Sequence, residues 1–211
     1  MEIARRDGTR EALIAAARSL FAEHGYGGTR PEQVARRVGI DPGALDERFP
    51  EGKEELFRAA LAQVGAALVR RIVAATARAP DPWSALEAGC EAFLDAVCER
   101  EVGRLLLIDA PAVLGPEAWR ALAFDYALGR LEAALQAAID AGQLLLPQPP
   151  FALAHVVLAA LDEAATEIAC ASDPHAARRE LGASVRALLE GLRTPGLGAA
   201  DRVSAAAQAR A

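Results

Sequence analysis

The chain has 211 residues, of which 53% are hydrophobic and only 5% are aromatic. This Ala- and Leu-rich composition favours helix over sheet and provides enough apolar residues for a sizeable core. The net charge is −6, yet residues 1–50 hold eight Arg and eight acidic residues, so the charge neither excludes nor requires nucleic acid as a partner of this segment.

Two helices are predicted at the start of the chain. Residues 9–24 carry apolar side chains at helical spacing, and Gly25 follows as a C-terminal stop. The run Thr29-Arg30-Pro31-Glu32 has the pattern of a capping box with Pro in the first turn, which predicts the start of a second helix. This second helix is expected to end at Gly39.

A third helix is predicted after the turn Gly39-Ile40-Asp41. Asp41 is a suitable N-cap, Pro42 suits the first helical position, and Phe49-Pro50 ends the helix. Two helices of about eight residues joined by such a turn match the helix-turn-helix layout of DNA-binding proteins. The same layout also occurs as a purely structural corner, and this alternative stays open at this point.

The rest of the chain is predicted to be an all-α bundle, which brings the total to about nine helices with no strand. The further helices are expected over residues 53–79, 81–100, 102–110, 117–141, 151–171 and 174–192. Pro111 is expected to end the short apolar helix. The predicted organisation is a head over residues 1–52, a body over 53–193 and a flexible tail over 194–211.

Composition also indicates a compartment. The longest uncharged stretch, residues 141–161, contains three Pro residues, so we expect two elements and a turn there and no membrane partner. Cys90, Cys98 and Cys170 lie in apolar surroundings with no signal peptide before them. We therefore expect free thiols in a reducing cytoplasm.

The head resembles the TetR-type (TetR/AcrR-like) transcriptional regulators. Residues 9–14 and 20–26 are similar to the first helix of that family. Similarity to its second and third helices and to the start of its fourth is carried by Thr29 and by residues 34–35, 38–40, 43–45, 49–50 and 53–57. In the body, residues 109–115 followed by Trp119-Arg120 are similar to one subgroup.

This resemblance implies a homodimeric, ligand-responsive repressor that leaves a palindromic double-stranded operator when a small-molecule effector enters the body. The residues expected to contact DNA lie in or beside the second and third helices: Thr29, Arg30, Asp41, Pro42, Gly43, Ala44, Asp46, Arg48 and Lys53. Thr29, at a helix start, suits a phosphate oxygen. Lys53, the only lysine, stands where the family has a phosphate-contacting Lys.

The third helix departs from the family pattern. Asp46 and Glu47 stand where Tyr and other aromatic or polar groups are usual, and Pro42 stands where a Lys is common. Two carboxylates facing phosphates are expected to weaken binding by about 1 kcal/mol each. A carboxylate can also accept a hydrogen bond from cytosine N4, and the alternative is that both side chains face solvent and the affinity for DNA is simply modest. The alternative function is a small-molecule-binding or scaffold protein whose DNA-binding head is degenerate.

Polar residues on otherwise apolar body helices are candidates for orienting an effector, although each can equally be a packed or interface residue. These candidates are Trp83, Cys90, Trp119, Tyr126, His155, Asp162 and Thr166. The last two helices are the expected dimer surface, through small residues and an apolar stripe: Ala160, Ala164, Val185, Leu188, Leu189 and Leu192. Two copies would form a four-helix bundle, whereas in a monomer the stripe would pack against the body.

The sequence has no motif typical of an enzyme. The three His lie apart from any Cys or carboxylate at metal-ligand spacing, and no Gly-rich phosphate loop is present. Cys90 and Cys98 fall near one helix face, but buried inert thiols explain such a pair more simply. We therefore expect no catalytic site, no metal and no cofactor.

Overall fold

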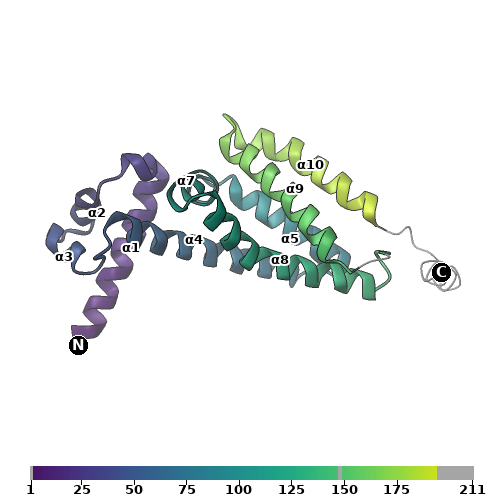
Figure 1. Cartoon of the computed structure of the whole chain (residues 1–211), viewed down its shortest axis with the longest axis horizontal. Coiled ribbons are helices and arrows are strands. Elements are labelled where there is room, and N and C mark those ends of the chain that lie inside the picture. Colours follow the sequence, from purple (N-terminus) through teal and green to yellow (C-terminus); the bar gives the residue numbers. More distant parts are fainter. Residues whose placement is uncertain (1, 147–148, 194–211) are drawn as a thin grey trace, which may run out of the picture.

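The computed structural model describes residues 2–146 and 149–193, without the side chains of residues 2–7 and 122–126, and it is helical throughout this part (Figure 1). Residues 194–211, the predicted tail, lie outside the described residues. Apart from a single bridge between Leu144 and Arg193, no strand pairing occurs in the described ranges. The elements are α1 (Glu2–Gly28), α2 (Pro31–Val38), α3 (Pro42–Asp46), α4 (Lys53–Thr76), α5 (Pro82–Val97), α6 (Arg100–Val102), η1 (Gly103–Asp109), α7 (Ala110–Leu114), α8 (Pro116–Asp140), α9 (Phe151–Cys170) and α10 (Pro174–Leu192).

The first helix is longer than residues 9–24, the span predicted for it. It starts at Glu2 and continues to Gly28, with one non-helical residue, Gly25, at φ 74° and ψ 171°. This conformation is open essentially to glycine alone, so the predicted stop at Gly25 is a break inside the element. A last short turn follows the break and delivers the chain to α2.

The segment 100–114 differs most from the prediction of one short helix ended by Pro111. Helical backbone continues through α6, η1 and α7, and Pro111 lies inside the first turn of α7. The middle stretch is a π-helix, in which the N–H of Ala110 bonds to the carbonyl of Leu105. Because this wider turn shifts the hydrogen-bond pattern, Pro111 can follow it and the helical backbone continues.

Gly103 lets this π-helix lie close to its neighbours. A Cβ at this position would lie 2.7 Å from the carbonyl oxygen of Val97 and 3.3 Å from Cβ of Ala169. Any larger residue would therefore push η1 away from α5 and α9. Glycine is needed here for close approach, since the backbone of Gly103 itself has ordinary helical angles.

Two clusters of buried apolar residues hold the bundle together. The first joins the head to α4 and η1, with the rings of Phe21, Tyr26 and Phe57 packed at centroid distances of 5.1–5.9 Å. The second lies among α5, α8, α9 and α10 and includes Trp83. Because the first cluster crosses residue 52, the core of the predicted head is shared with the start of the predicted body.

Ion pairs and hydrogen bonds reinforce the contact between α1 and α6. Arg18 binds Glu101 through two nitrogens, at 2.7 and 2.9 Å. Arg100 donates to the backbone carbonyl of Glu23 at 3.0 Å. A bidentate Arg–carboxylate pair fixes orientation better than a single contact, so α1 has a defined position on the body.

Helix α4 is, within the described part of the chain, long and apolar enough to cross a membrane by length and composition alone. Its first half packs into the first core through Leu56, Phe57 and Ala60. Arg58 and Arg70 are exposed along it. One such helix, with 17% of its apolar window buried, does not identify a membrane protein.

Candidate nucleic-acid interface

The turn between α2 and α3 sets the angle at which the two helices meet. Gly39 adopts left-handed angles, φ 77° and ψ 33°, and the N–H of Ile40 bonds back to the carbonyl of Ala35 at 3.0 Å. The Asp41 carboxylate then accepts a hydrogen bond from the N–H of Gly43 at 2.8 Å. The predicted turn and N-cap are therefore present, and α3 begins at Pro42 as expected.

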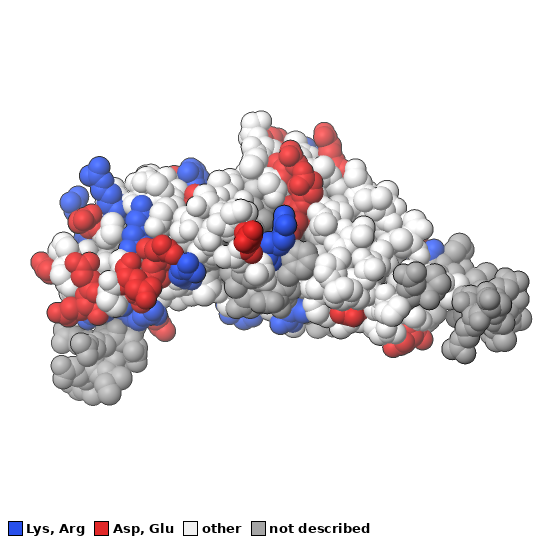
Figure 2. Space-filling view, in the orientation of Figure 1, with Lys and Arg blue, Asp and Glu red and all other residues white. Residues whose placement is uncertain are grey.

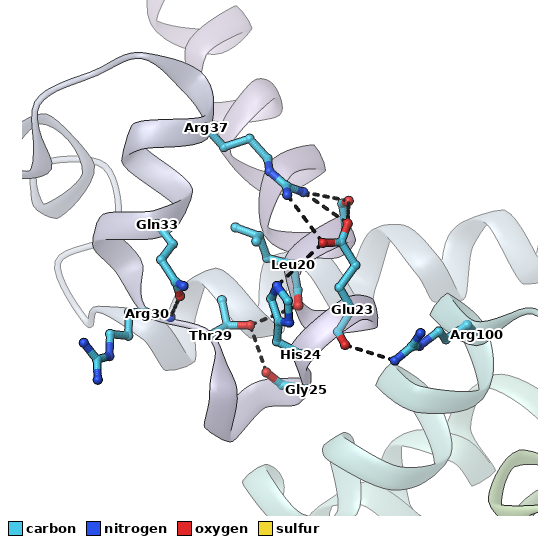
Figure 3. A network of polar contacts seen from close by, with 10 residues as sticks. Leu20, Glu23, His24, Gly25, Thr29, Arg30, Gln33, Arg37 and Arg100 are labelled. Atoms are coloured by element: carbon cyan, nitrogen blue, oxygen red, sulfur yellow. Dashed lines mark hydrogen bonds and ion pairs between the residues drawn. The ribbon is translucent and has the colours of Figure 1, made fainter.

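Helix α2 is held against α1 by polar contacts (Figure 3). Arg37 of α2 donates to Ser19 at 3.0 Å and forms an ion pair with Glu23 at 3.3 Å, both on α1. At the start of α2 the N–H of Arg30 donates to the side chain of Gln33 at 2.7 Å. The cap is thus made by Arg30 and Gln33, one residue later than the predicted capping box.

Thr29 has a different role from the phosphate contact predicted for its side chain. It is only 1% exposed, and its hydroxyl lies 2.9 Å from the carbonyl oxygen of Gly25 and 3.1 Å from that of Leu20 (Figure 3). The break at Gly25 diverts the Thr29 N–H to Tyr26, so the Gly25 carbonyl needs another donor. The hydroxyl supplies it, which corrects the prediction: this side chain holds the α1–α2 corner together.

Helix α3 occupies the end of the head farthest from the body (Figure 1). Leu45 and, beyond the helix, Phe49 are buried in the first core, so the opposite side faces outward. The outward residues are Asp41, Pro42, Gly43, Asp46 and Glu47, all exposed. Acidic side chains accordingly gather over α3 in Figure 2, whereas basic ones lie over the neighbouring α2.

The cations predicted to contact DNA are partly engaged within the chain. Arg48 turns back and donates to the carbonyl of Ala44 at 2.6 Å. The Lys53 ammonium lies 4.2 Å from the centroid of the Tyr26 ring, and burial lowers the pKa of this lysine. The side chain of Arg30 is exposed, so a contact with DNA stays a prediction for this residue.

Arg36, which is not among the residues predicted to contact DNA, is a further cation available at this surface. It is exposed in the last turn of α2, and no ion pair or hydrogen bond engages its guanidinium within the described residues. Its neighbour Arg37 is engaged by Glu23. Arg36 and Arg37 therefore differ in the ion pair that Arg37 forms with α1. The sequence of α2 alone does not predict which of the two arginines forms it.

Comparison with known proteins identifies the fold. A family model described as "Bacterial regulatory proteins, tetR family" matches residues 13–60, and one described as "Tetracyclin repressor-like, C-terminal domain" matches residues 83–192, more than half of the chain. The chain belongs to the TetR family of bacterial transcriptional regulators. The resemblance carried by the head is thereby confirmed, and the helix-turn-helix is a DNA-binding head joined to a helical body.

Individual relatives agree with this assignment. A TetR-family transcriptional regulator from Pectobacterium atrosepticum shares 31% identity and a TM-score of 0.78, over 91% of this chain and 97% of its own. The transposon Tn10 TetC protein of Escherichia coli is 23% identical over 136 residues, which are 64% of this chain and 68% of that protein. RolR, solved in complex with the ligand resorcinol, shares the fold at 18% identity and a TM-score of 0.64, over 95% of this chain and 93% of its own.

In this TetR-family protein the predicted effector residues lie in different parts of the body. Trp83 and Cys90 are buried in the second core, where burial raises the pKa of the Cys90 thiol to about 12. Trp119 packs at the edge of the first core. Trp83 and Cys90 are thus core residues in the described structure, because their helix turns that face toward α8 and α9. The side chain of Tyr126 lies outside the described residues.

The other three candidates are on α9. His155 packs on the ring of Phe151 at a centroid distance of 4.2 Å, and the Thr166 hydroxyl donates to the backbone carbonyl of Asp162 at 2.9 Å. Burial raises the pKa of the Asp162 carboxyl, and Arg120 lowers it. Asp162 is the candidate whose side-chain oxygens have no hydrogen-bond partner in the described part of the chain.

None of the six candidates with described side chains lines either of two shallow hollows. One, of about 310 Å³, lies between the end of α9 and the start of α10, beside Cys170. The other, of about 390 Å³, lies beside Arg18 and Glu101 where α1 meets α6. Neither of these two hollows therefore brings the candidates with described side chains together.

The apolar stripe predicted for the dimer surface of α10 faces inward. Val185 and Leu189 are buried in the second core, and Leu192 packs against it. These residues share one side of the helix, which packs on α9 and α5 of the same chain, so they belong to its core. Leu188 is on another side and is 64% exposed.

On α9, Ala164 is buried and Ala160 is half-buried, so neither presents an open surface. The exposed apolar side chains of this region are instead Phe151 and Val156, at 53% and 66%, together with Leu188 of α10. Reading the sequence missed Phe151 and Val156, because α9 is apolar nearly all round and its periodicity does not single out an outer face.

Proposed function

We propose that this TetR-family protein is a homodimeric repressor, which binds a two-fold symmetric operator through α3 and releases it when a small molecule occupies the body. The observation that supports this most is that the chain holds α3 in place by itself. The αL turn at Gly39, the Asp41 cap and the Arg37–Glu23 pair fix its position without DNA. A fixed helix at the outer end of the head can enter a major groove with little ordering cost.

Two copies are required because one short helix reaches few base pairs. The outer surface of α9 and α10 is the dimer contact that we propose. Val156 and Leu188 are its large apolar residues, and exposed Ala159 and Ala187 allow close approach of a second copy. Isologous pairing of these two helices gives a four-helix bundle and places the two heads in a two-fold relationship.

For the effector we propose a small organic molecule that enters the body near α9 and acts in the cytoplasm. RolR, which shares the fold, was solved with the ligand resorcinol. Asp162 is the residue we retain as its partner, since its half-buried carboxylate has no hydrogen bond to any described residue. A donor group on the ligand would satisfy this carboxylate.

The test is a titration of labelled DNA from the region ahead of the gene, against a scrambled duplex of equal length, at low salt and then at rising salt. A repressor gives a complex with the genomic duplex that the scrambled one does not form, and log K falls steeply with log salt. Equal binding to both duplexes would refute the operator and favour the degenerate-head alternative, for which the acidic outer side of α3 is the supporting observation.

A matched pair of variants tests Lys53. Lys53→Ala removes a cation at the start of α4 in each protomer, and we expect the salt slope to fall by about one unit per protomer, hence about two for the dimer. Arg70→Ala removes an exposed charge from the same helix, 17 residues on and hence about 25 Å away, and we expect no change in slope. If both variants change the salt slope equally, Lys53 makes no specific phosphate contact.

A further inference from the structure

The outward side of α3 offers DNA an unusual set of chemical groups. Pro42 and Gly43 have no hydrogen-bonding side chain, and the Asp41 carboxylate is already occupied by the N–H of Gly43 at 2.8 Å. Asp46 and Glu47 are exposed, and no ion pair or hydrogen bond engages their carboxylates within the described residues. The groups left to meet base edges are therefore acceptors only.

Neither Arg48 nor Lys53 changes this character. Arg48, the next residue along the chain, donates to the carbonyl of Ala44 at 2.6 Å, and its Nε is buried without a partner among the described residues. The Lys53 ammonium lies over the Tyr26 ring. Asp46 and Glu47 consequently reach the outer surface as free carboxylates, and Figure 2 shows an acidic area over α3.

Major-groove chemistry then limits which bases such a surface can recognise. Guanine presents acceptors at N7 and O6, thymine presents the acceptor O4, and a carboxylate is repelled by each of them. Adenine has an N6 donor, but its N7 acceptor lies beside that donor. Cytosine presents its N4 amino group with no major-groove acceptor on the same base. A carboxylate therefore finds its best partner in cytosine.

Resting on the proposed operator binding, we infer that the Asp46–Glu47 pair is the specificity determinant of α3 and reads cytosine in each operator half-site. The two acids repel phosphates wherever the head touches DNA, and the hydrogen bond to N4 offsets this repulsion only at the correct base. Repulsion at all other sequences makes the pair a source of discrimination as well as of weak binding.

The test is a parallel selection from random duplex DNA with the intact wild-type protein and three variants. The wild type is expected to enrich a two-fold symmetric site with one cytosine per half-site, preferred over thymine by about tenfold or more. Asp46→Ala with Glu47→Ala should remove this preference while the rest of the site is kept. Glu32→Ala, which removes another exposed head carboxylate outside α3, should keep the cytosine.

A second double variant gives a positive result that simple charge removal cannot produce. Asp46→Asn with Glu47→Gln keeps the shape of both side chains and adds donors, and Asn and Gln pair with N6 and N7 of adenine. We expect the selected base to change from cytosine to adenine. All variants are checked by thermal melting, and exposed positions should leave the Tm unchanged.

The possible failures are distinguishable. If the wild type enriches no sequence, the proposed operator binding itself is wrong. If the wild type enriches a site and both double variants keep its base preferences, the proposed operator binding stands and the inferred recognition of cytosine is overturned. Uniformly tighter binding with unchanged preferences would likewise mean that the two carboxylates only repel phosphates.

Discussion

The carboxylate of Asp109 accepts a hydrogen bond from the backbone N–H of Tyr26 at 2.9 Å, across 83 positions of sequence. Asp109 ends the π-helix η1, and Tyr26 follows the break in α1, so this bond joins the body to the head. Burial raises the pKa of Asp109, whereas the Tyr26 N–H, Arg104 and Lys53 lower it. This partly buried carboxylate is thus one of the contacts that orient the DNA-binding head on the body, together with the Arg18–Glu101 pair.

Replacing Asp109 tests this joint. Asp109→Ala leaves the Tyr26 N–H unpaired, and we expect the free energy of unfolding to fall by about 1–3 kcal/mol in urea denaturation. Asp109→Asn keeps an oxygen acceptor in the same place and should lose less. If the alanine variant unfolds at the urea concentration of the wild type, the bond contributes nothing to the joint.

Gly25 is the position in α1 where we expect substitution to be most harmful. Its φ of 74° and ψ of 171° are open essentially to glycine alone, and an added Cβ would also collide with the Arg104 guanidinium. Gly25→Ala should destabilise the protein by about 1–3 kcal/mol. Arg104→Ala in the same chain would relieve the collision and leave the backbone strain.

The matched control for Gly25 is Gly27→Ala, two residues later in the same helix. An added Cβ there meets nothing within 4 Å, and Gly27 is not among the glycines with positive φ. We expect its Tm to stay level or rise slightly, because alanine favours helix. Equal losses in both variants would show that the special conformation of Gly25 is unimportant.

Substitutions of Thr29 distinguish a structural role of its hydroxyl from a contact with DNA. Thr29→Val removes the buried hydroxyl and leaves the Gly25 and Leu20 carbonyls without it, so we expect a loss of about 1–2 kcal/mol in unfolding free energy. Thr29→Ser keeps the hydroxyl and should lose much less. Well below their melting temperatures both variants should bind DNA with the wild-type salt slope. A smaller salt slope in the valine variant alone would instead support the phosphate contact predicted from the sequence.

Asp81 gives a prediction about pH. As N-cap of α5 it accepts hydrogen bonds from the N–H and hydroxyl of Ser84 and from Gln143, and these lower its pKa from 3.8 to about 2. A lowered pKa means that its stabilisation is present above about pH 4 and is lost as the pH falls toward 2. Asp81→Ala should therefore melt at a lower temperature at neutral pH and lose less than the wild type on acidification. Parallel wild-type and variant curves across this pH range would contradict the assignment.

Local signals in the sequence located most helices closely. Asp41-Pro42, Asp81-Pro82 and Asp173-Pro174 each place an N-cap before a proline at the first helical position, and each starts a helix in the structure. These signals act within one turn, so no tertiary contact is needed to read them. The turn at Gly39 was predictable for the same reason.

Features that depend on tertiary contacts were not predictable in this way. The close approach of Gly103 to α5 and α9 depends on how those helices pack, and the inward turn of Thr29 follows from carbonyls freed by the break at Gly25. The stripe of Val185 and Leu189 was visible, but whether it meets its own chain or a second copy is decided by the packing of α9 and α5. Periodicity shows that a face is buried, without showing what buries it.

The measurement that tests the central claim most directly is a hydroxyl-radical footprint of the intact protein on DNA from the region ahead of its gene. A dimer that inserts α3 into the major groove predicts two symmetric protected segments, with centres one helical turn of about 10 base pairs, or a multiple of it, apart. Even cleavage along the duplex, at protein concentrations where the chain is folded, would contradict the account.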